Sequence, residues 1–423
     1  MSKAGAMLIV MLIIAVCFIT EIIPIAVTAM TGAIACGVLG FIPAKQVFMG
    51  FSDPNVMTFC GMFVVGAAMF YTGLAQSIGE KVVSVVGRTE TRIMFGVMLI
   101  SGALSALLSN TGTVACLMPV VIGICAAAKI PASRQLMPLA FAAGLGGSIT
   151  LVGTPANMII NTTLQGAGLQ GLGFFELAWI GIPQTVVGII YFVTIGKYLL
   201  PKATIKEQDI EQEIVATSHD SKHQIISGVI LIVVVIMMAL NLKWMNLAMA
   251  AVLGGIVAVL TGCLSEKQAY LSVDWVTVIV LGAMMPVAKA LDVTGAGKAI
   301  ADVALSVMGS NPHPLVLMGV LFVITCFLTQ FMSNMAATAL LAPVGLAIAK
   351  ELGASPIAVL VAIALASSAA FASPVGTPPN TLVMGPGGYK FMDYVKAGTG
   401  LIVCSFITIM IIVPIVWPFF PGK

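Results

Sequence analysis

One short polar pattern occurs twice in this chain, with nearly the same internal spacing. Ser109-Asn110 is followed by a Gly-Thr-Pro motif at 153–155, and Ser333-Asn334 is followed by the same motif at 376–378. Proline removes a backbone hydrogen bond and glycine relaxes the backbone, so each motif should interrupt a helix. Apolar segments interrupted at corresponding positions of two halves are typical of a binding site between two structural repeats.

Composition places the chain in a membrane. Hydrophobic residues make up 60% of its 423 residues and charged residues only 8%, and the mean hydropathy is +1.11. A soluble domain carries about 25% charged residues. Apolar spans of roughly membrane-crossing length are predicted near 4–20, 24–42, 56–76, 174–198, 224–241, 246–263, 275–292 and 397–418. We expect an all-α polytopic protein of the cell membrane, with the first span retained and not cleaved as a signal peptide.

Charge, cysteine and histidine content argue against several other functions. The net charge of +3 is too small to suggest nucleic acid, and the eight cysteines occur singly, without a CxxC pair. An intramembrane enzyme would need a nucleophile with its base, or metal ligands, within the spans, but His219, His223 and His313 fall in predicted loops. A channel would not need a duplicated pair of closed hairpins. These features favour a carrier.

The chain divides into two halves joined by its longest hydrophilic segment. The ranges 1–200 and 225–423 are predicted to be repeats, and 201–224 is predicted to be a cytoplasmic linker. Each half should contain a re-entrant helical hairpin and a broken transmembrane helix. The hairpins are expected at about 93–128 and 312–350, and the broken helices at about 136–165 and 356–385.

The predicted hairpins decide how the halves are oriented. If each hairpin enters and leaves on one side, each half crosses the membrane five times, and an odd number of crossings inverts one half relative to the other. With both termini outside, twelve of the nineteen lysines and arginines lie on the cytoplasmic side. This distribution agrees with the positive-inside rule.

Broken helices and hairpin tips supply the groups that an ion site needs. Serine hydroxyls, asparagine amides and unwound backbone carbonyls offer the oxygen atoms that hard cations such as sodium prefer. Helices that start just after each tip direct their N-terminal amides to the same place, which suits an anion. No aspartate or glutamate lies in either broken region, which argues against a proton-relay exchanger.

The residues around the Gly-Thr-Pro motifs can be assigned parallel roles. Gly153 and Gly376 would present carbonyls, and the threonines that follow them would present hydroxyls. The downstream residues Asn157 and Asn380 are expected to cap the freed backbone. Ser105 and Thr329, one helical turn before the tip serines, either extend the oxygen cluster or bond to a carbonyl of their own helix.

These motifs, together with Thr20-Glu21-Ile22-Ile23-Pro24, resemble the divalent anion:sodium symporter (DASS) family of the ion transporter superfamily. The resemblance covers most of the chain. It implies a homodimer in which each protomer has a scaffold domain and a transport domain that moves as an elevator. It also implies that sodium ions and a divalent anion bind together between the tips.

The resemblance also assigns site residues. One sodium ion would bind Ser105, Ser109, Asn110 and the carbonyl of Gly153. A second would bind Thr329, Asn334 and the carbonyls of Met332 and Gly376. The substrate would contact Ser109, Asn110 and Thr111 on one side and Ser333, Asn334, Thr377 and Pro378 on the other.

The sequence departs from the family pattern in two places. Met335 stands where the second tip of the family has threonine, so one hydroxyl that could contact the substrate is replaced by an apolar side chain. The chain is also expected to lack an N-terminal span that is common in the family, which is why its N-terminus is placed outside.

The expected function is therefore secondary active transport, with sodium-coupled symport of a small divalent anion such as a C4-dicarboxylate. Sulfate, citrate, tartrate or another oxyanion remains an alternative because of Met335. Sodium-independent anion exchange is a further alternative. It would require a fixed positive charge, and the sequence places none near the tips.

Overall fold

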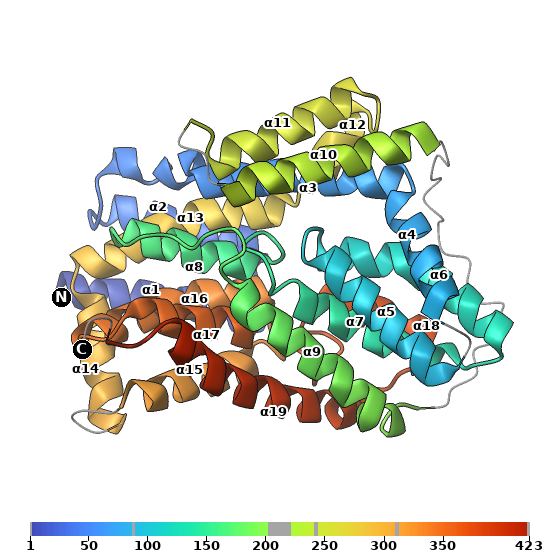
Figure 1. Ribbon diagram of the computed structural model, residues 1–423. Helices are drawn as coiled ribbons and strands as arrows, with labels where there is room; N and C mark the ends of the chain where they lie inside the picture. The colour runs from blue at the N-terminus through green and yellow to red at the C-terminus, as the bar shows by residue number, and fades with distance from the viewer. Residues whose placement is uncertain (1, 87–88, 202–220, 241–243, 309–312, 421–423) are drawn as a thin grey trace.

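The computed structural model describes residues 2–86, 89–201, 221–240, 244–308 and 313–420. Within these ranges every regular element is a helix (Figure 1). This confirms the all-α fold class. Most of the predicted linker 201–224 lies outside the described residues.

The helices follow one another in a similar order in the two halves of the chain. The first half contains α1 (Lys3–Thr20), α2 (Ile25–Val38), η1 (Ala44–Gln46), η2 (Met49–Ser52), α3 (Pro54–Tyr71), α4 (Leu74–Val86), α5 (Glu90–Ser105), α6 (Asn110–Ala128), η3 (Ala132–Arg134), α7 (Leu136–Gly146), α8 (Pro155–Gly166), α9 (Ala178–Thr194) and η4 (Gly196–Tyr198). The second half contains α10 (Ser221–Leu240), α11 (Leu247–Leu260), α12 (Glu266–Ser272), α13 (Trp275–Val293), α14 (Ala296–Met308), α15 (Pro314–Leu328), α16 (Asn334–Glu351), α17 (Pro356–Ser367), α18 (Pro378–Gly387) and α19 (Phe391–Val416).

Many of these helices are long and apolar enough to cross a bilayer. Among the described residues, six segments qualify by length and composition: α1, the segment Ala44–Tyr71 that ends with α3, α6, α10, α13 and α19. Large apolar side chains such as Leu12 on α1, Ile225 on α10 and Ile415 on α19 are exposed on the protein surface. Such side chains suit contact with lipid, in agreement with a multi-pass membrane protein.

The two halves of the chain contact each other through two pairs of helices. Helix α3 of the first half packs against α11 of the second, and α13 of the second half packs against α2 of the first. Gly61 makes the first contact possible, because a Cβ at this position would overlap the backbone of Ala251. The inverted orientation of the halves stays a prediction.

One predicted span is divided into two helices. The apolar segment 56–76 was predicted as one span, but α3 ends at Tyr71 and α4 begins at Leu74. In the second half, α13 ends at Val293 and α14 begins at Ala296. The glycine at each junction has a left-handed backbone, with φ 74° at Gly73 and 75° at Gly295. This conformation ends a helix, and sequence reasoning did not predict α4 and α14 as separate helices.

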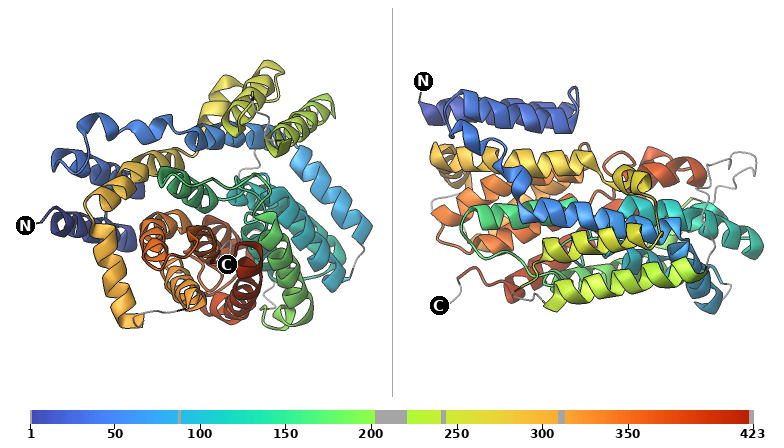
Figure 2. Two further views of the ribbon diagram at one scale, coloured as in Figure 1. Left: turned by 60° about the vertical axis from the view of Figure 1, so that its left-hand side comes forward. Right: turned by 90° about the horizontal axis from the view of Figure 1, so that it is seen from above.

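The helices form two groups. Helices α5–α9 pack with α15–α19, while α1–α3 and α10–α13 lie along one side of them (Figure 2). Phe141 is central to the first group, with its ring 5.7 Å from Phe192 and 5.1 Å from Phe371. Tyr389, between α18 and α19, is buried near α7 and accepts a hydrogen bond from Met137 N at 2.8 Å. Burial raises the pKa of Tyr389, so its phenol stays neutral.

Candidate functional site

Each predicted hairpin tip is a short break between two helices. Helix α5 ends at Ser105 and α6 begins at Asn110, and the Oγ of Ser109 accepts a hydrogen bond from Gly112 N at 3.0 Å. Ser333 caps α16 similarly and accepts from Ala336 N at 3.2 Å. An N-cap serine has extended backbone and satisfies one of the free amides of the first turn. The Ser-Asn pairs therefore define where the second helix of each hairpin starts.

The asparagine of each tip contacts a buried hydroxyl from the preceding helix. Ser105 Oγ donates to Asn110 Oδ1 at 2.6 Å, and Thr329 Oγ1 lies 2.8 Å from Asn334 Oδ1. Ser105 and Thr329 are both fully buried. Thr329 Oγ1 also lies 2.7 Å from the carbonyl of Ser367, at the end of α17. Both hydroxyls thus belong to an oxygen cluster behind the tips.

The amide of Asn334 meets several oxygen atoms at one point. Its Oδ1 faces Thr329 Oγ1, the carbonyl of Ser367 and the carbonyl of Gly376, at 2.8, 2.9 and 3.3 Å. If the amide is turned by 180°, its nitrogen donates to these groups. If Asn334 Oδ1 faces these groups, four oxygen atoms lie together and only the Thr329 hydroxyl can supply a proton between them. The arrangement is satisfied when the amide is turned so that its nitrogen donates, or when a cation binds among the oxygens.

The predicted broken helices are interrupted at the Gly-Thr-Pro motifs. Helix α7 ends at Gly146 and α8 begins at Pro155, while α17 ends at Ser367 and α18 begins at Pro378. Proline fits the first position of a helix because its missing N–H would have no partner there. Among the described residues, the hydroxyl of Thr154, next to Pro155, has no hydrogen-bond partner, and the oxygen itself is buried.

Asn157 and Asn380 hold the unwound segments in place. Asn157 Nδ2 donates to the carbonyls of Gly147 and Thr150 at 3.1 and 2.8 Å. Asn380 Nδ2 donates to the carbonyls of Ala370 and Ser373 at 2.7 and 2.9 Å. Both asparagines are buried. Their contacts agree with the structural role expected from the sequence.

The glycines of the two motifs allow close backbone approach. A Cβ on Gly153 would overlap the carbonyl of Gly147, and a Cβ on Gly376 would overlap the carbonyl of Thr329. A side chain at either position would push the unwound segment away from its neighbour. These glycines therefore keep the break of each helix compact.

The tips and the breaks meet around one cavity of about 190 Å³. Its walls include the first residues of α6, α8, α16 and α18, so four helix N-termini lie around it. Of the described residues that line it, none is a lysine, arginine or histidine. Helix N-termini carry a partial positive charge, so the backbone supplies the positive potential of this cavity.

The cavity brings most of the predicted site residues together. Those that line it are Ser109, Asn110, Thr111, Gly153, Ser333, Asn334, Gly376, Thr377 and Pro378. Ser105 and Thr329 lie behind the tip asparagines and do not line it. Met332 lies just before the second tip with its side chain buried, and it is also absent from the lining.

Sequence reasoning missed the wall that faces the tips. Phe59, Met62 and Phe63 of α3 line the cavity, and so do Asp274 and Thr277 at the start of α13. Phe59 and Phe63 pack together, with ring centroids 4.8 Å apart. These apolar residues resemble those of any membrane helix, so they carry no local signal.

Asp274 is the one residue of this wall that a motif could have indicated. It caps α13, where its Oδ1 accepts from Val276 N at 3.0 Å and from Thr277 N at 3.2 Å. Asp53 caps α3 at the corresponding position of the first half and accepts from Asn55 N at 2.8 Å. An aspartate before an apolar span in both halves is thus a repeated feature of the sequence.

Known proteins resemble this chain over most of its length. Residues 15–304 and 237–421 match the citrate transporter family, CitMHS. An uncharacterised transporter of Haemophilus influenzae is 29% identical over 419 residues, which cover 94% of this chain and 88% of that protein. The sodium-dependent dicarboxylate transporter SdcS of Staphylococcus saprophyticus is 26% identical over 451 residues, with 97% of this chain and 86% of the relative covered.

A solved structure supports the fold. The YdaH transporter of Alcanivorax borkumensis superposes with a TM-score of 0.67 at 15% identity, over 90% of this chain and 87% of that chain. Together with the family match and the helical architecture, this likeness places the chain among membrane carriers and not among enzymes. The chain belongs to the citrate transporter (CitMHS) family of DASS-type anion permeases, and it is an anion transporter of the membrane.

Proposed function

We propose that this protein is a sodium-coupled symporter of a small divalent anion, with a C4-dicarboxylate as its substrate. The observation that carries the proposal is the cavity between the tips. Four helix N-termini surround it, and within the described part of the chain its lining contains no cationic side chain. A site of this kind attracts an anion but needs further positive charge to hold a dianion.

The substrate would occupy the cavity between the two tips. Ser109, Asn110 and Thr111 would bind one end of it, and the other contacts would come from the second half. These are Ser333, Asn334, Thr377 and Pro378. Backbone amides at the helix starts are donors that fit carboxylate oxygens.

Two sodium sites would lie behind the tips. The first would use Ser105, Ser109, Asn110 and the carbonyl of Gly153. The second would use Thr329, Asn334 and the carbonyls of Met332 and Gly376. The hydroxyl of Thr329 and the carbonyls of Ser367 and Gly376 lie together at the amide of Asn334, and this group of oxygens supports the second site.

Coupling would follow from the charge of the site. Sodium ions would lower the energy of the bound dianion, and the dianion would strengthen sodium binding by the same factor. A half-loaded site would carry an unbalanced charge between apolar helices, which costs energy in a low-dielectric medium. We further propose that α5–α9 and α15–α19 move together as an elevator. The protein would be a homodimer in the cell membrane, with both termini of each protomer outside.

The name of the SdcS relative, which is 26% identical, supports sodium as the coupling ion and a dicarboxylate as the substrate.

A second candidate function is transport of another anion, such as citrate, sulfate or tartrate. Met335 lines the cavity in place of a hydroxyl-bearing residue, and Phe59 and Phe63 of α3 add further apolar surface to the same cavity. The second tip therefore holds its end of the anion differently from the first, so the two ends of the substrate need not be alike.

Uptake by reconstituted vesicles tests the proposal. Purified protein in proteoliposomes is given radiolabelled succinate, citrate or sulfate, with sodium or choline outside. We expect succinate uptake that requires inward sodium and exceeds uptake of citrate and sulfate. Empty liposomes and vesicles with equal sodium on both sides are the controls.

The outcomes separate the candidates. Equal uptake with choline and with sodium would reject coupling and favour exchange. Sodium-driven uptake of citrate or sulfate but not of succinate would keep the symport mechanism and replace the substrate.

A further inference from the structure

Three amide side chains form a chain of hydrogen bonds where α3 meets α8. Asn161 Nδ2 on α8 donates to Asn55 Oδ1 on α3 at 2.9 Å. Asn55 Nδ2 in turn donates at 2.8 Å to the Oε1 of Gln165, which lies one turn further along α8. Helix α3 belongs to one of the two groups of helices and α8 to the other. The amide chain therefore joins the two groups.

A backbone group fixes the orientation of these amides. The N–H of Leu172 can only donate, and it donates to Asn161 Oδ1 at 2.7 Å. Asn161 must then turn its nitrogen towards Asn55, and Asn55 must turn its own nitrogen towards Gln165. Asn55 and Asn161 are 4% and 0% exposed, whereas Gln165 lies at the surface. Separation of α3 from α8 would thus break two hydrogen bonds of buried amides.

The loop after α8 connects this amide chain to the tip cavity. Gly171 lies so close to it that a Cβ there would overlap the amide groups of Gln165 and Asn161. Further along the loop, the carbonyl of Phe174 accepts a hydrogen bond from Leu151 N at 3.0 Å. Leu151 belongs to the unwound segment before α8, whose next residues line the tip cavity. Contacts therefore run without a gap from α3 to the tip cavity.

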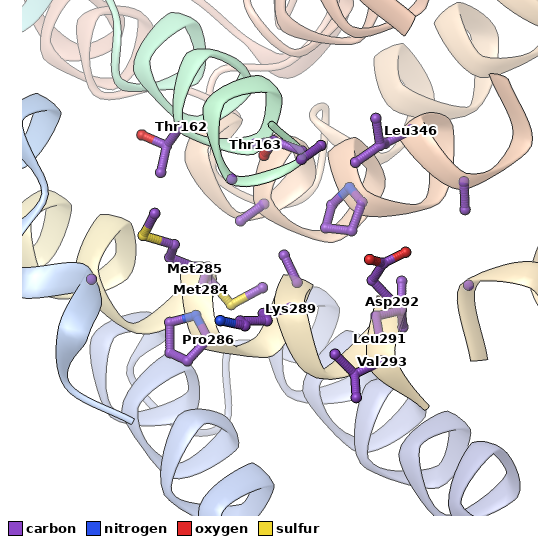
Figure 3. A pocket seen from close by; sticks show the side chains of 18 of the residues that line it. Thr162, Thr163, Met284, Met285, Pro286, Lys289, Leu291, Asp292, Val293 and Leu346 are labelled. Atoms are coloured by element: carbon purple, nitrogen blue, oxygen red, sulfur yellow. The ribbon is translucent and has the colours of Figure 1, made fainter. Parts of the chain in front are cut away.

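A second cavity, of about 340 Å³, lies on another side of α8, between this helix, α13 and α16 (Figure 3). Thr162 and Thr163 on α8 lie across it from Met284 and Met285 on α13. Protein interiors are normally packed without large voids. The cavity leaves room for α8 to move relative to α13, whereas the amide chain holds α8 to α3.

The second half of the chain has no counterpart of these amides. The N-cap aspartates of α3 and α13 align the starts of these two helices, and the Gly-Thr-Pro motifs at 153–155 and 376–378 align α8 with α18. None of the matching side chains can form an amide chain. The matching residues are Val276 for Asn55, Met384 for Asn161 and Gly388 for Gln165.

We propose that Asn55, Asn161 and Gln165 form a latch that stabilises one of the two access states of the carrier. The latch is closed when α8 lies on α3 and opens when the two groups of helices move apart. No equivalent latch stabilises the opposite state. This inference rests on the relative movement of the two groups in the proposed function. In the topology proposed there, the start of α3 and the end of α8 lie outside, so the latch opposes opening to the outside.

Hydrogen–deuterium exchange, followed by mass spectrometry of the purified full-length protein, tests the latch without using transport. Peptides over 167–177 report on the loop after α8, and peptides over 380–391 report on the end of α18. In Gln165→Ala the loop after α8 should exchange about fivefold faster, the factor that corresponds to one neutral hydrogen bond. Asn55→Ala removes two bonds and should give about 25-fold.

The end of α18 distinguishes a latch from a merely structural contact. Loss of a latch shifts the protein towards the opposite state, in which α18 packs on α13, so exchange at 380–391 should become slower in both variants. Loss of a structural contact would accelerate exchange near α8 and leave the end of α18 unchanged. Gln165 is exposed, so Gln165→Ala gives a readable result even if Asn55→Ala does not fold.

Matched variants complete the test. Gln165→Glu keeps the oxygen that accepts from Asn55 and should exchange like the wild type. Gln170→Ala removes an exposed glutamine of the same loop that lies outside the amide chain, and it should also leave exchange unchanged. The latch is overturned if exchange near α8 rises without a fall at the end of α18, or if Gln165→Ala behaves like Gln170→Ala. Exchange is measured in potassium buffer without substrate, so a failure of wild-type vesicles to take up succinate would reject the proposed function and not the latch.

Discussion

The first hairpin tip ends in Thr111 and the second in Met335, although a Ser-Asn pair precedes each. The shared part is the structural one. In both tips the serine caps the following helix, and the asparagine oxygen lies within hydrogen-bonding distance of a buried hydroxyl behind it, from Ser105 or Thr329. The part that differs lines the tip cavity, where a substrate would bind.

The difference between the tips distinguishes the proposed cation sites from the proposed anion site. Oxygens behind the tips are duplicated, so the proposed cation sites should be nearly equivalent. Side chains in front of the tips are not duplicated, because Thr111 offers a hydroxyl and Met335 offers a thioether. The proposed anion site should therefore be one-sided, with its polar contacts at the first tip.

Removal of either tip asparagine should have the largest effect. Asn110→Ala and Asn334→Ala each delete an oxygen from a proposed sodium site, so sodium-driven uptake should fall about 10- to 150-fold, as expected for about 1.5–3 kcal/mol. Initial rates over a range of sodium concentrations measure the loss. Asn246→Ala, at the distant cap of α11, is the matched control and should keep its uptake. A large loss in only one tip variant would contradict the equivalence of the two cation sites.

The asparagines of the broken helices should matter for stability. Asn157→Ala and Asn380→Ala each remove two hydrogen bonds to backbone carbonyls. At about 1 kcal/mol per bond, each variant should lose about 2 kcal/mol and unfold at a lower temperature. Thermal unfolding in detergent measures the change, and Asn246→Ala, which removes the single cap bond of α11, is the reference for a loss of about 1 kcal/mol. Unchanged Tm values would show that the unwound segments do not depend on these contacts.

The helix interruptions could be predicted because local rules determine them. Proline has no N–H, glycine relaxes the backbone, and a Ser-Asn pair readily caps a helix. Chain length and apolar content then indicate membrane helices. Helix α4 was missed because the span 56–76 was predicted to continue across Gly73. Helix α14 was missed because it follows the predicted span 275–292 and carries Lys298 and Asp302, so its residues do not resemble a membrane span.

The wall opposite the tips could not be predicted, because it depends on contacts between distant parts of the chain. Phe59 and Phe63 are ordinary residues of an apolar helix until α3 lies beside the hairpins. The second cavity is a similar case. Lys289 lies in an apolar part of the sequence, and only the packing of α8 and α16 beside α13 shows that it lines a cavity.

Exchange of the third tip residue should change selectivity by about tenfold. Met335→Thr supplies one hydroxyl donor, and a hydrogen bond to a carboxylate contributes about 1.5 kcal/mol, so kcat/KM for succinate should rise about tenfold. Thr111→Met removes the corresponding donor and should lower it by a similar factor. Competition between succinate and citrate measures the ratio directly. If both exchanges had the same effect, the anion site would be symmetric and the comparison of the tips would be wrong.

The smallest predicted effect on transport comes from a substitution on the side of the cavity that faces the tips. Asp274 places a carboxylate on the lining of a cavity that would hold a dianion. Asp274→Asn keeps an N-cap acceptor for α13 and removes the repulsion, so KM for succinate should fall about threefold at low ionic strength. The gain should shrink when choline chloride is added at constant sodium, because salt screens the interaction. It should also be equal in wild-type and Met335→Thr backgrounds, since a charge on the wall acts on the whole anion. A higher KM would instead mean that Asp274 binds a cation that travels with the substrate.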